Sequence, residues 1–261
     1  MLPNKIITLT TDFGKAGGYA GAVKGVLLEI NPNLKIVDVT HEVSCFNVLE
    51  GALVLNSFYQ FFPKGTIHLA VVDPGVGGKR KGILIRTDNY FFVGPDNGIF
   101  SFVYEQERVR KMVNITNSEY FLRKPSSSFH ARDIFAPVSA YLSLGVKPGE
   151  FGSPAQDCYK LKLPQPLYRK DHLLGEIIYI DGFGNLITNI SSSLISNKSS
   201  VRIRVRSKII NHLSQYYEEE KNGKLLALIG SGNFFEISVN QGNAQRLLKA
   251  KVGDKITIEN F

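Results

Sequence analysis

Three loop segments of this sequence combine glycines with charged or polar side chains, the combination from which nucleotide-binding and proton-transfer sites are built. They are residues 10–14 (TTDFG), residues 73–80 (DPGVGGKR) and residues 129–133 (FHARD). In the first segment, Asp12 could accept two hydrogen bonds from the diol of a ribose, as acidic residues do in nucleotide sites. Asp12 could equally cap a turn or the start of a helix, and residue type alone leaves both interpretations open.

The second segment, residues 73–80, has three glycines in eight residues, which allows a ligand to approach the backbone closely. It lacks the order G-x-x-x-x-G-K-[ST], so it is not a phosphate-binding loop of that class. The alternative interpretation is an ordinary hairpin loop between strands at residues 67–72 and 82–86.

The third segment places His130 next to charged residues at the expected start of a helix. A histidine in such surroundings can hold or transfer a proton near neutral pH, although a structural role is equally open. The remaining histidines lack such neighbours, and we expect structural roles for them: His41, His68, His172 and His212. No two histidines have zinc-protease spacing and no Gly-x-Ser-x-Gly motif occurs, so neither metal-dependent hydrolysis nor a serine triad is supported.

A fourth segment, residues 181–185 (DGFGN), lies in the second half of the chain. Phe183 offers an aromatic face for stacking, and the amide of Asn185 can hydrogen-bond two adjacent positions on a purine edge. A hairpin turn is also expected here, and the two interpretations are compatible.

The elements that must position these loops alternate between strand and helix in the first half of the chain. Apolar patterning predicts five strands, at residues 5–10, 35–39, 67–72, 82–86 and 90–93. It predicts three helices, at residues 19–30, 47–62 and 133–144. This alternation predicts a mainly parallel sheet covered by helices, with ligands bound beyond the carboxyl ends of the strands.

From about residue 172 the pattern changes to short β-rich segments separated by glycine or asparagine, at residues 174–180, 186–190, 201–206, 225–229, 234–239 and 255–259. Such spacing is typical of an all-β sandwich or barrel. A proline-containing connector at residues 163–166 separates the two patterns. We therefore expect an α/β domain over residues 1–165 and a smaller, barrel-like all-β domain over residues 166–261.

Composition favours a soluble globular protein, with 43% hydrophobic and 21% charged residues. No apolar run approaches the roughly 18 residues of a membrane helix, and no secretory signal is visible. Cys45 and Cys158 lack metal-ligand spacing, which favours reduced packing residues in a cytoplasmic protein. We therefore expect no membrane partner.

The net charge of +8 raises the possibility of nucleic-acid binding, but it is divided equally between residues 1–165 and 166–261. Its one cluster is a set of basic residues at alternate positions: Arg202, Arg204, Arg206 and Lys208. A solvated strand face is the favoured interpretation, because half-buried strands normally expose charge on their outer side. We expect no nucleic-acid partner.

Seven motifs follow one another along the chain: TTDFG (10–14), VDVTHEV (37–43), VVDPGVGGKR (71–80), FVGPDNGIF (92–100), FHARDIFAP (129–137), IDGFGNLITNI (180–190) and EISVNQGNA (236–244). Taken in this order, they resemble the S-adenosylmethionine hydrolases (adenosine-forming), also called SAM hydroxide adenosyltransferases, which are related to fluorinases and chlorinases. The resemblance extends from residue 6 to about residue 258.

The resemblance implies roles for nine residues. Asp73, Arg80 and His130 match the polar triad around the attacking water. The implied substrate contacts are Asp12 to ribose, Phe46 as an aromatic wall, Asp181 and Ser231 to the methionine ammonium and carboxylate, and Phe183 and Asn185 to adenine. It also implies homotrimers whose sites combine the α/β domain of one subunit with the β domain of the next, and neither a cofactor nor a metal. The chain departs from the family pattern at Ala131, where glycine is expected, and at Gly232 and Asn233 beside Ser231.

The implied reaction is attack of water on the 5′ carbon of S-adenosylmethionine, giving adenosine and methionine. Whether Asp73 or His130 is the base stays open. One alternative is a halide-using enzyme, against which Asp73 counts because the halogenases have no acid at that position. The other alternative is a non-catalytic protein that binds S-adenosylmethionine or a nucleoside.

Overall fold

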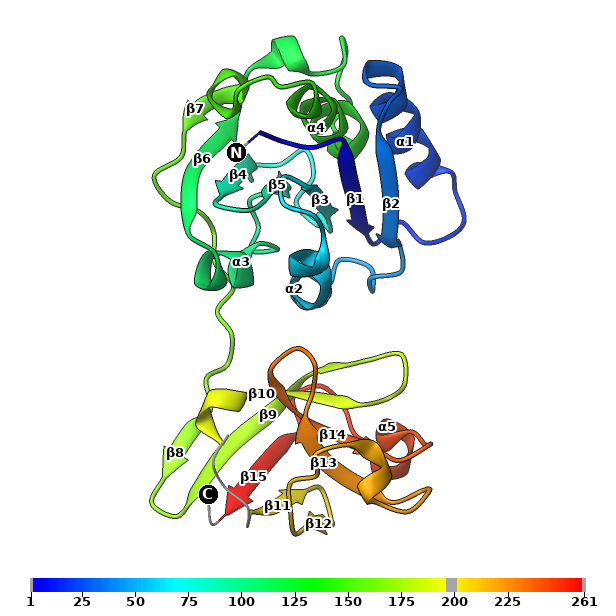
Figure 1. Ribbon diagram of the computed structural model, residues 1–261, viewed down its shortest axis with the longest axis vertical. Helices are drawn as coiled ribbons and strands as arrows, with labels where there is room; N and C mark the ends of the chain where they lie inside the picture. The colour runs from blue at the N-terminus through cyan, green and yellow to red at the C-terminus, as the bar shows by residue number, and fades with distance from the viewer. Residues whose placement is uncertain (1, 196–200, 260–261) are drawn as a thin grey trace. The chain divides into compact units, whose positions relative to one another are not determined.

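The computed structural model describes residues 2–195 and 201–259. The chain forms two compact units, Met1–Leu161 and Lys162–Phe261 (Figure 1). We describe each unit by itself.

The first unit is built on a seven-stranded sheet with the order β2-β1-β3-β5-β4-β6-β7. Strands β2, β1, β3 and β5 pair in parallel, and β4, β6 and β7 extend the sheet by antiparallel pairing. The strands are β1 (Ile6–Thr11), β2 (Lys35–Thr40), β3 (Ile67–Val71), β4 (Gly82–Thr87), β5 (Phe91–Pro95), β6 (Val109–Ile115) and β7 (Gly152–Pro154). This mixed, mostly parallel sheet confirms the predicted α/β class, although β6 and β7 were not predicted.

Helices cover both faces of this sheet, so its central strands β1, β3 and β5 are buried along almost their whole length. In β3, Leu69 and Val71 face a core shared with α1 and α4, whereas Ala70 faces a second core that includes α2 and α3 side chains. The helices are α1 (Tyr19–Ile30), α2 (Val48–Phe58), α3 (Ser101–Gln106), a π-helix (Ala131–Phe135) and α4 (Ala136–Ser143), with short 3₁₀ turns at Tyr59–Phe61, Ser118–Tyr120 and Pro148–Phe151.

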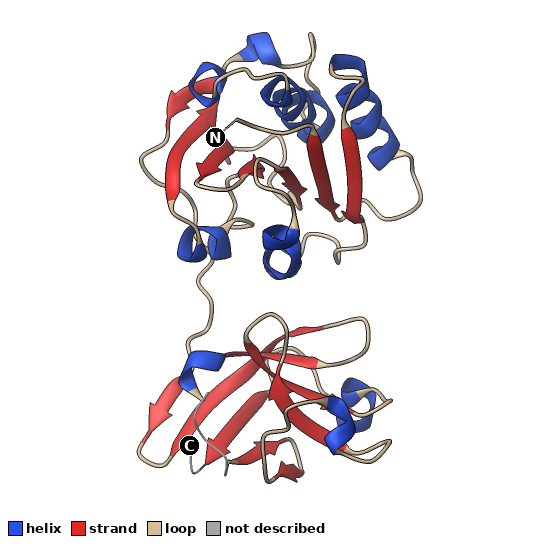
Figure 2. Ribbon diagram, in the orientation of Figure 1, coloured by secondary structure: helices blue, strands red, loops and turns tan. Residues whose placement is uncertain are grey.

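The second unit consists mainly of strands (Figure 2). They form an antiparallel sheet with the order β12-β11-β15-β9-β10-β14-β13, and β8 pairs with β9. The two ends of this order, β12 and β13, come close together, so the sheet is nearly barrel-shaped, as predicted. The elements are β8 (Leu167–Arg169), β9 (His172–Ile180), β10 (Leu186–Ser191), β11 (Arg202–Val205), β12 (Lys208–Ile210), β13 (Leu225–Ile229), β14 (Phe234–Val239), α5 (Ala244–Leu248) and β15 (Lys255–Glu259), with 3₁₀ turns at Ser192–Leu194 and Tyr217–Glu219.

The basic cluster of the sequence is an exposed surface rather than one uninterrupted strand face. Arg202 and Arg204 lie on β11 and both pair with Glu259 of β15, at 3.7 and 3.5 Å. Arg206 lies in the turn after β11, where it pairs with Asp254, and Lys208 begins β12. Over the described residues, no helix is long and apolar enough to cross a membrane.

Candidate active site

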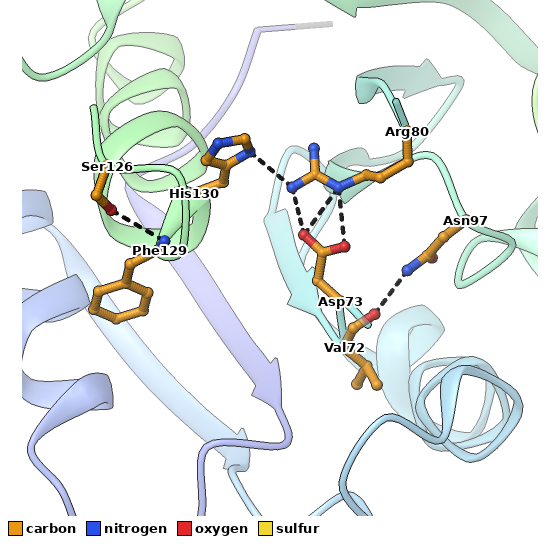
Figure 3. A network of polar contacts seen from close by, with 7 residues as sticks. All are labelled: Val72, Asp73, Arg80, Asn97, Ser126, Phe129 and His130. Atoms are coloured by element: carbon orange, nitrogen blue, oxygen red, sulfur yellow. Dashed lines mark hydrogen bonds and ion pairs between the residues drawn. The ribbon is translucent and has the colours of Figure 1, made fainter. Parts of the chain in front are cut away.

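Asp73 and Arg80 form an ion pair at the carboxyl end of β3. Asp73 follows that strand by two residues, and Arg80 precedes β4 by two residues. The Arg80 Nε donates to both carboxylate oxygens at 2.9 Å, and Nη2 donates to Oδ2 as well (Figure 3). The two side chains are only 7% and 12% exposed, respectively. Because β5 lies between β3 and β4 in the sheet, the connecting loop is a crossover and not the hairpin considered as the alternative.

His130 joins this pair through Arg80. The Nη2 of Arg80 lies 2.9 Å from the Nδ1 of His130 (Figure 3). A guanidinium can only donate, so Nδ1 accepts and the proton of the neutral imidazole is on Nε2. Burial, and then the positive charge of Arg80, lower the pKa of His130, which favours this neutral form.

A buried carboxylate holds the backbone around His130. Asp133 is 1% exposed and accepts from the backbone N–H and hydroxyl of Ser126, at 2.8 and 2.7 Å, and from Arg132. The Ser126 hydroxyl accepts in turn from the N–H of Phe129 at 3.1 Å (Figure 3). Burial raises the pKa of Asp133, but the hydrogen bonds from Arg132 and Ser126 outweigh burial and bring that pKa below its ordinary value. The sequence motif FHARD contains this residue, but sequence reasoning assigned it no role.

The loops that carry Arg80 and His130 touch at Gly77. This residue has φ +75°, and a Cβ built on it would lie 2.0 Å from the carbonyl oxygen of Ser127. Only glycine permits this approach. On the other side of the loop, the Asn97 amide donates to the carbonyl of Val72 at 2.7 Å, which holds the backbone just before Asp73 (Figure 3).

Asp12 and Phe46 meet at the carboxyl ends of β1 and β2. The backbone N–H of Phe46 donates to Asp12 Oδ2 at 2.9 Å. Asp12 does not cap α1, whose N-cap residue is Gly18. Phe46 has φ 65°, and the residue is 69% exposed.

A cavity of about 330 Å³ brings four of these predicted residues together. Its lining residues are Asp12, Phe46, Asp73 and His130, with Phe13, Tyr19, Cys45, Val71, Val76, Ser128, Phe129 and Ala131. Arg80 supports the wall through Asp73 and His130. Sequence reasoning missed the aromatic cluster in which Phe129 packs edge-on against Phe13 and Tyr19, with ring centroids 5.7 and 5.2 Å apart. Phe13 and Phe129 lie inside recognised motifs, whereas Tyr19 had no signal beyond the start of a helix.

In the second unit, residues 181–185 form the turn between β9 and β10, so the hairpin interpretation is correct. Asp181 Oδ1 accepts from the backbone N–H groups of Phe183 and Asn185, and Oδ2 accepts from the side-chain amide of Asn185, all at 2.9 Å. Ser231 lies in the turn between β13 and β14.

A cavity of about 230 Å³ lies beside this turn. Of the described residues, its lining consists of Phe183, Asn185, Tyr217, Val239, Gln241 and Gly242. Asp181 and Ser231 are not among them. Tyr217 carried no signal in the sequence; its hydroxyl donates to Glu236 at 2.9 Å, and burial, followed by that carboxylate, raises its pKa to about 12. Within residues 2–195 and 201–259, no group of three or more potential ligand side chains could hold a metal ion.

Family models match both units of the chain. The SAM hydroxide adenosyltransferase N-terminal domain matches residues 7–152, and the C-terminal domain of the same family matches residues 175–257. The chain belongs to the SAM hydroxide adenosyltransferase family. This membership confirms the resemblance seen in the motifs.

The chain is similar to known proteins over almost its whole length. An (R)-S-adenosyl-L-methionine hydrolase of Methanocaldococcus jannaschii is 39% identical over 267 residues, covering 97% of this chain and 95% of the relative. Another from Salinispora tropica is 35% identical and covers 99% of both chains. A fluorinase of Actinoplanes sp. is more distant, at 28% identity over 72% of each chain. The crystal structure of an uncharacterized conserved protein from Thermotoga maritima superimposes with a TM-score of 0.90 at 38% identity, covering 97% of this chain and 100% of that one.

Proposed function

We propose that this protein is an S-adenosylmethionine hydrolase that releases adenosine and methionine by attack of water on the 5′ carbon. The observation that carries the proposal is the hydrogen-bonded array of Asp73, Arg80 and His130 at the wall of a cavity that also contains Asp12. The hydrolases to which the chain is 39% and 35% identical support the choice of substrate and reaction.

The reaction needs help at the nucleophile and none at the leaving group. The water oxygen forms a bond to C5′ while the C5′–S bond breaks. The electron pair of the C5′–S bond stays on sulfur. The sulfonium therefore leaves as the neutral thioether of methionine, and no general acid is required. Water is a poor nucleophile, so the site must orient it and accept its proton. Holding water and substrate in line could supply up to roughly 7–11 kcal/mol of the barrier reduction.

Within this proposal Asp73 is the base and His130 a hydrogen-bond donor. The Nδ1 lone pair of His130 is occupied by Arg80, and its Nε2 carries the proton, so the neutral imidazole has no free lone pair with which to act as the base. A carboxylate has about four lone-pair sites, and the Arg80 contacts leave room on Asp73 for a water. The Arg80 charge would also stabilise hydroxide as it forms.

We propose the substrate contacts that the resemblance implies. Asp12 would hold the ribose diol and Phe46 would pack against the substrate. Phe183 and Asn185 would contact adenine, and Asp181 and Ser231 the two charged ends of methionine. S-Adenosylmethionine is the substrate, and the proposal includes no cofactor.

The proposal includes a cytoplasmic homotrimer with sites shared between subunits. The cysteines Cys45 and Cys158 are both free, which supports a reducing compartment. The residues proposed to activate water and those proposed to bind the nucleobase belong to different units of the chain. A closed three-fold ring of subunits is one arrangement that brings the first unit of one subunit to the second unit of the next.

The test is incubation with S-adenosylmethionine in buffer containing chloride and fluoride, followed by chromatography. We expect adenosine and methionine in equal amounts. A 5′-halo-adenosine would show instead a halide-using enzyme like the fluorinase relative. Tight binding without any product would show a non-catalytic binding protein.

A further inference from the structure

The side-chain amide of Asn185 has one orientation imposed on it by Asp181. Oxygen and nitrogen of such an amide are similar in shape, so their positions must be inferred from their partners. The Asp181 carboxylate can only accept, and it lies 2.9 Å from one end of the Asn185 amide. That end is therefore the NH₂ group, and the oxygen, Oδ1, is directed away from Asp181. Within the described part of the chain, no hydrogen bond to this oxygen is found.

The turn that carries Asp181 is held too firmly for the pair to rearrange easily. Asp181 Oδ1 accepts the backbone N–H groups of Phe183 and Asn185. The next contact fixes the turn to α5, because the N–H of Gln245 donates to the carbonyl of Gly184 at 2.9 Å. Gly184 itself has φ +86°, and a Cβ built on it would lie 2.1 Å from the Asn243 side chain. Asn185 is only 7% exposed and lines the 230 Å³ cavity.

We propose that Asp181 is a positioning residue for base recognition: it holds Asn185 so that the cavity selects a 6-amino purine over a 6-oxo purine. The inference rests on the proposed function for the identity of the ligand, a purine nucleoside. It adds a role for Asp181 that does not involve the methionine part of the substrate.

The selection follows from the donors and acceptors of the two bases. Adenine has an amino group at position 6 and an acceptor at N7. An asparagine meets this pair with its oxygen and its NH₂ group, respectively. Asn185 retains one NH₂ hydrogen for N7 after donating the other to Asp181. Hypoxanthine has an oxygen at position 6, which would face the Asn185 oxygen without a proton between them, and such a mismatch is costly when buried.

The experiment is calorimetric titration of the full chain with adenosine and with inosine. Neither ligand contains methionine, so a contact between Asp181 and the methionine ammonium cannot contribute. We expect the wild type to prefer adenosine by on the order of 10–100-fold. In Asp181→Asn, the new oxygen still accepts the backbone N–H groups, while the new NH₂ donates to Asn185 and turns its amide over. This variant should reverse the preference toward inosine.

A swapped pair tests the same inference without depending on the single variant. In the double variant Asp181→Asn/Asn185→Asp, the amide at position 181 donates to a carboxylate at position 185, which again presents an acceptor to the cavity. We expect the adenosine preference to return. Asp254→Asn is the matched control, because Asp254 also accepts a turn N–H, from Lys251 at 2.9 Å, outside this cavity. It should retain the wild-type preference.

The possible results distinguish a failure of this inference from a failure of the proposed function on which it rests. If the wild type prefers adenosine and Asp181→Asn retains the full preference, the positioning role is wrong and the hydrolase proposal stands. The positioning role is also overturned if the single variant loses the preference but the swapped pair does not regain it. If the wild type neither binds adenosine nor cleaves S-adenosylmethionine, the proposed function fails and this inference fails with it.

Discussion

Asp73, Arg80 and His130 share their hydrogen bonds, so each should be needed for turnover. We expect Asp73→Asn, Arg80→Ala and His130→Ala each to lower kcat by about 10²–10⁴, the range typical of lost general acid–base groups. Substrate affinity should change much less, because in the proposed mechanism the triad acts on the water. Turnover by chromatography and binding by calorimetry measure the two effects. Near-normal turnover in all three variants would show that the triad is assigned wrongly.

The pH dependence of turnover should report on His130. The neutral imidazole accepts from Arg80 at Nδ1, and protonation of Nδ1 would remove that hydrogen bond. Activity is therefore lost as pH falls through the pKa of His130. Burial and the Arg80 charge lower that pKa, so the loss should occur below the ordinary value of about 6.5.

The measurement is kcat/KM against pH for the wild type and for His130→Gln, which cannot titrate. The acidic loss of activity should be absent from the variant. An unchanged acidic limb in His130→Gln would assign the titration to another group.

At the scale of elements, the crossover between β3 and β4 depends on its contact at Gly77. In Gly77→Ala the new Cβ would collide with the Ser127 carbonyl and separate Arg80 from His130. Gly145→Ala is the matched control: Gly145 also has a positive φ, of +96°, but nothing lies within 4 Å of the position that its Cβ would take. Gly145→Ala should lose about 1–2 kcal/mol of stability from backbone strain, and Gly77→Ala should lose more because of the collision. Only Gly77→Ala should also lose most of its turnover, as measured by kcat beside thermal unfolding. Equal turnover in the two variants would contradict the role of this contact.

The pairing of β1 with β3 includes a buried histidine that should make the protein sensitive to acid. His68 of β3 is fully buried and its Nδ1 lies 2.8 Å from the Thr8 hydroxyl of β1. Burial lowers the pKa of His68 to about 3. Below about pH 6.5, His68 binds a proton in the unfolded chain but not in the folded chain. The free energy of unfolding therefore falls by up to about 1.4 kcal/mol per pH unit.

Urea denaturation at pH 7 and pH 5 measures this effect. The wild type should lose about 2 kcal/mol more over this interval than His68→Gln, whatever the absolute stability of the variant. His172→Gln, in the second unit, serves as the control and should behave as the wild type. An identical loss in the wild type and His68→Gln would contradict the interpretation.

At the scale of the whole molecule, a homotrimer with shared sites predicts complementation between two inactive variants. Subunits with Asp73→Asn lack a working first unit, and subunits with Asn185→Ala lack a working second unit. In mixed rings, some interfaces pair two intact halves, and equal mixing should restore about a quarter of the sites. Activity after subunit exchange measures this, with light scattering for the subunit number. A monomer, or no recovery after proven exchange, would refute the shared site.

The sequence by itself determined the class of each unit and the family. Mostly apolar strands such as β3 indicate cover on both faces of a sheet, and the change to short β-rich segments after residue 172 indicates an all-β sandwich or barrel. The sequence patterns did not predict elements that are short or charged. The six residues of α3 are too few for a helical period, and β6 exposes Arg110 and Lys111. The domain limits and the roles of the site residues remain predictions.

Only the tertiary structure decided how the site is connected. The insertion of β5 between β3 and β4 turns residues 73–80 into a crossover, and it is long-range packing that brings Arg80 within hydrogen-bond distance of a histidine 50 residues away. The tautomer of His130 and the amide orientation of Asn185 depend on single partners, Arg80 and Asp181. The tautomer and the amide orientation follow from the side-chain rotamers within packed loops. Residue order alone does not specify them, because the hydrogen bonds that decide them join atoms that come together only on folding.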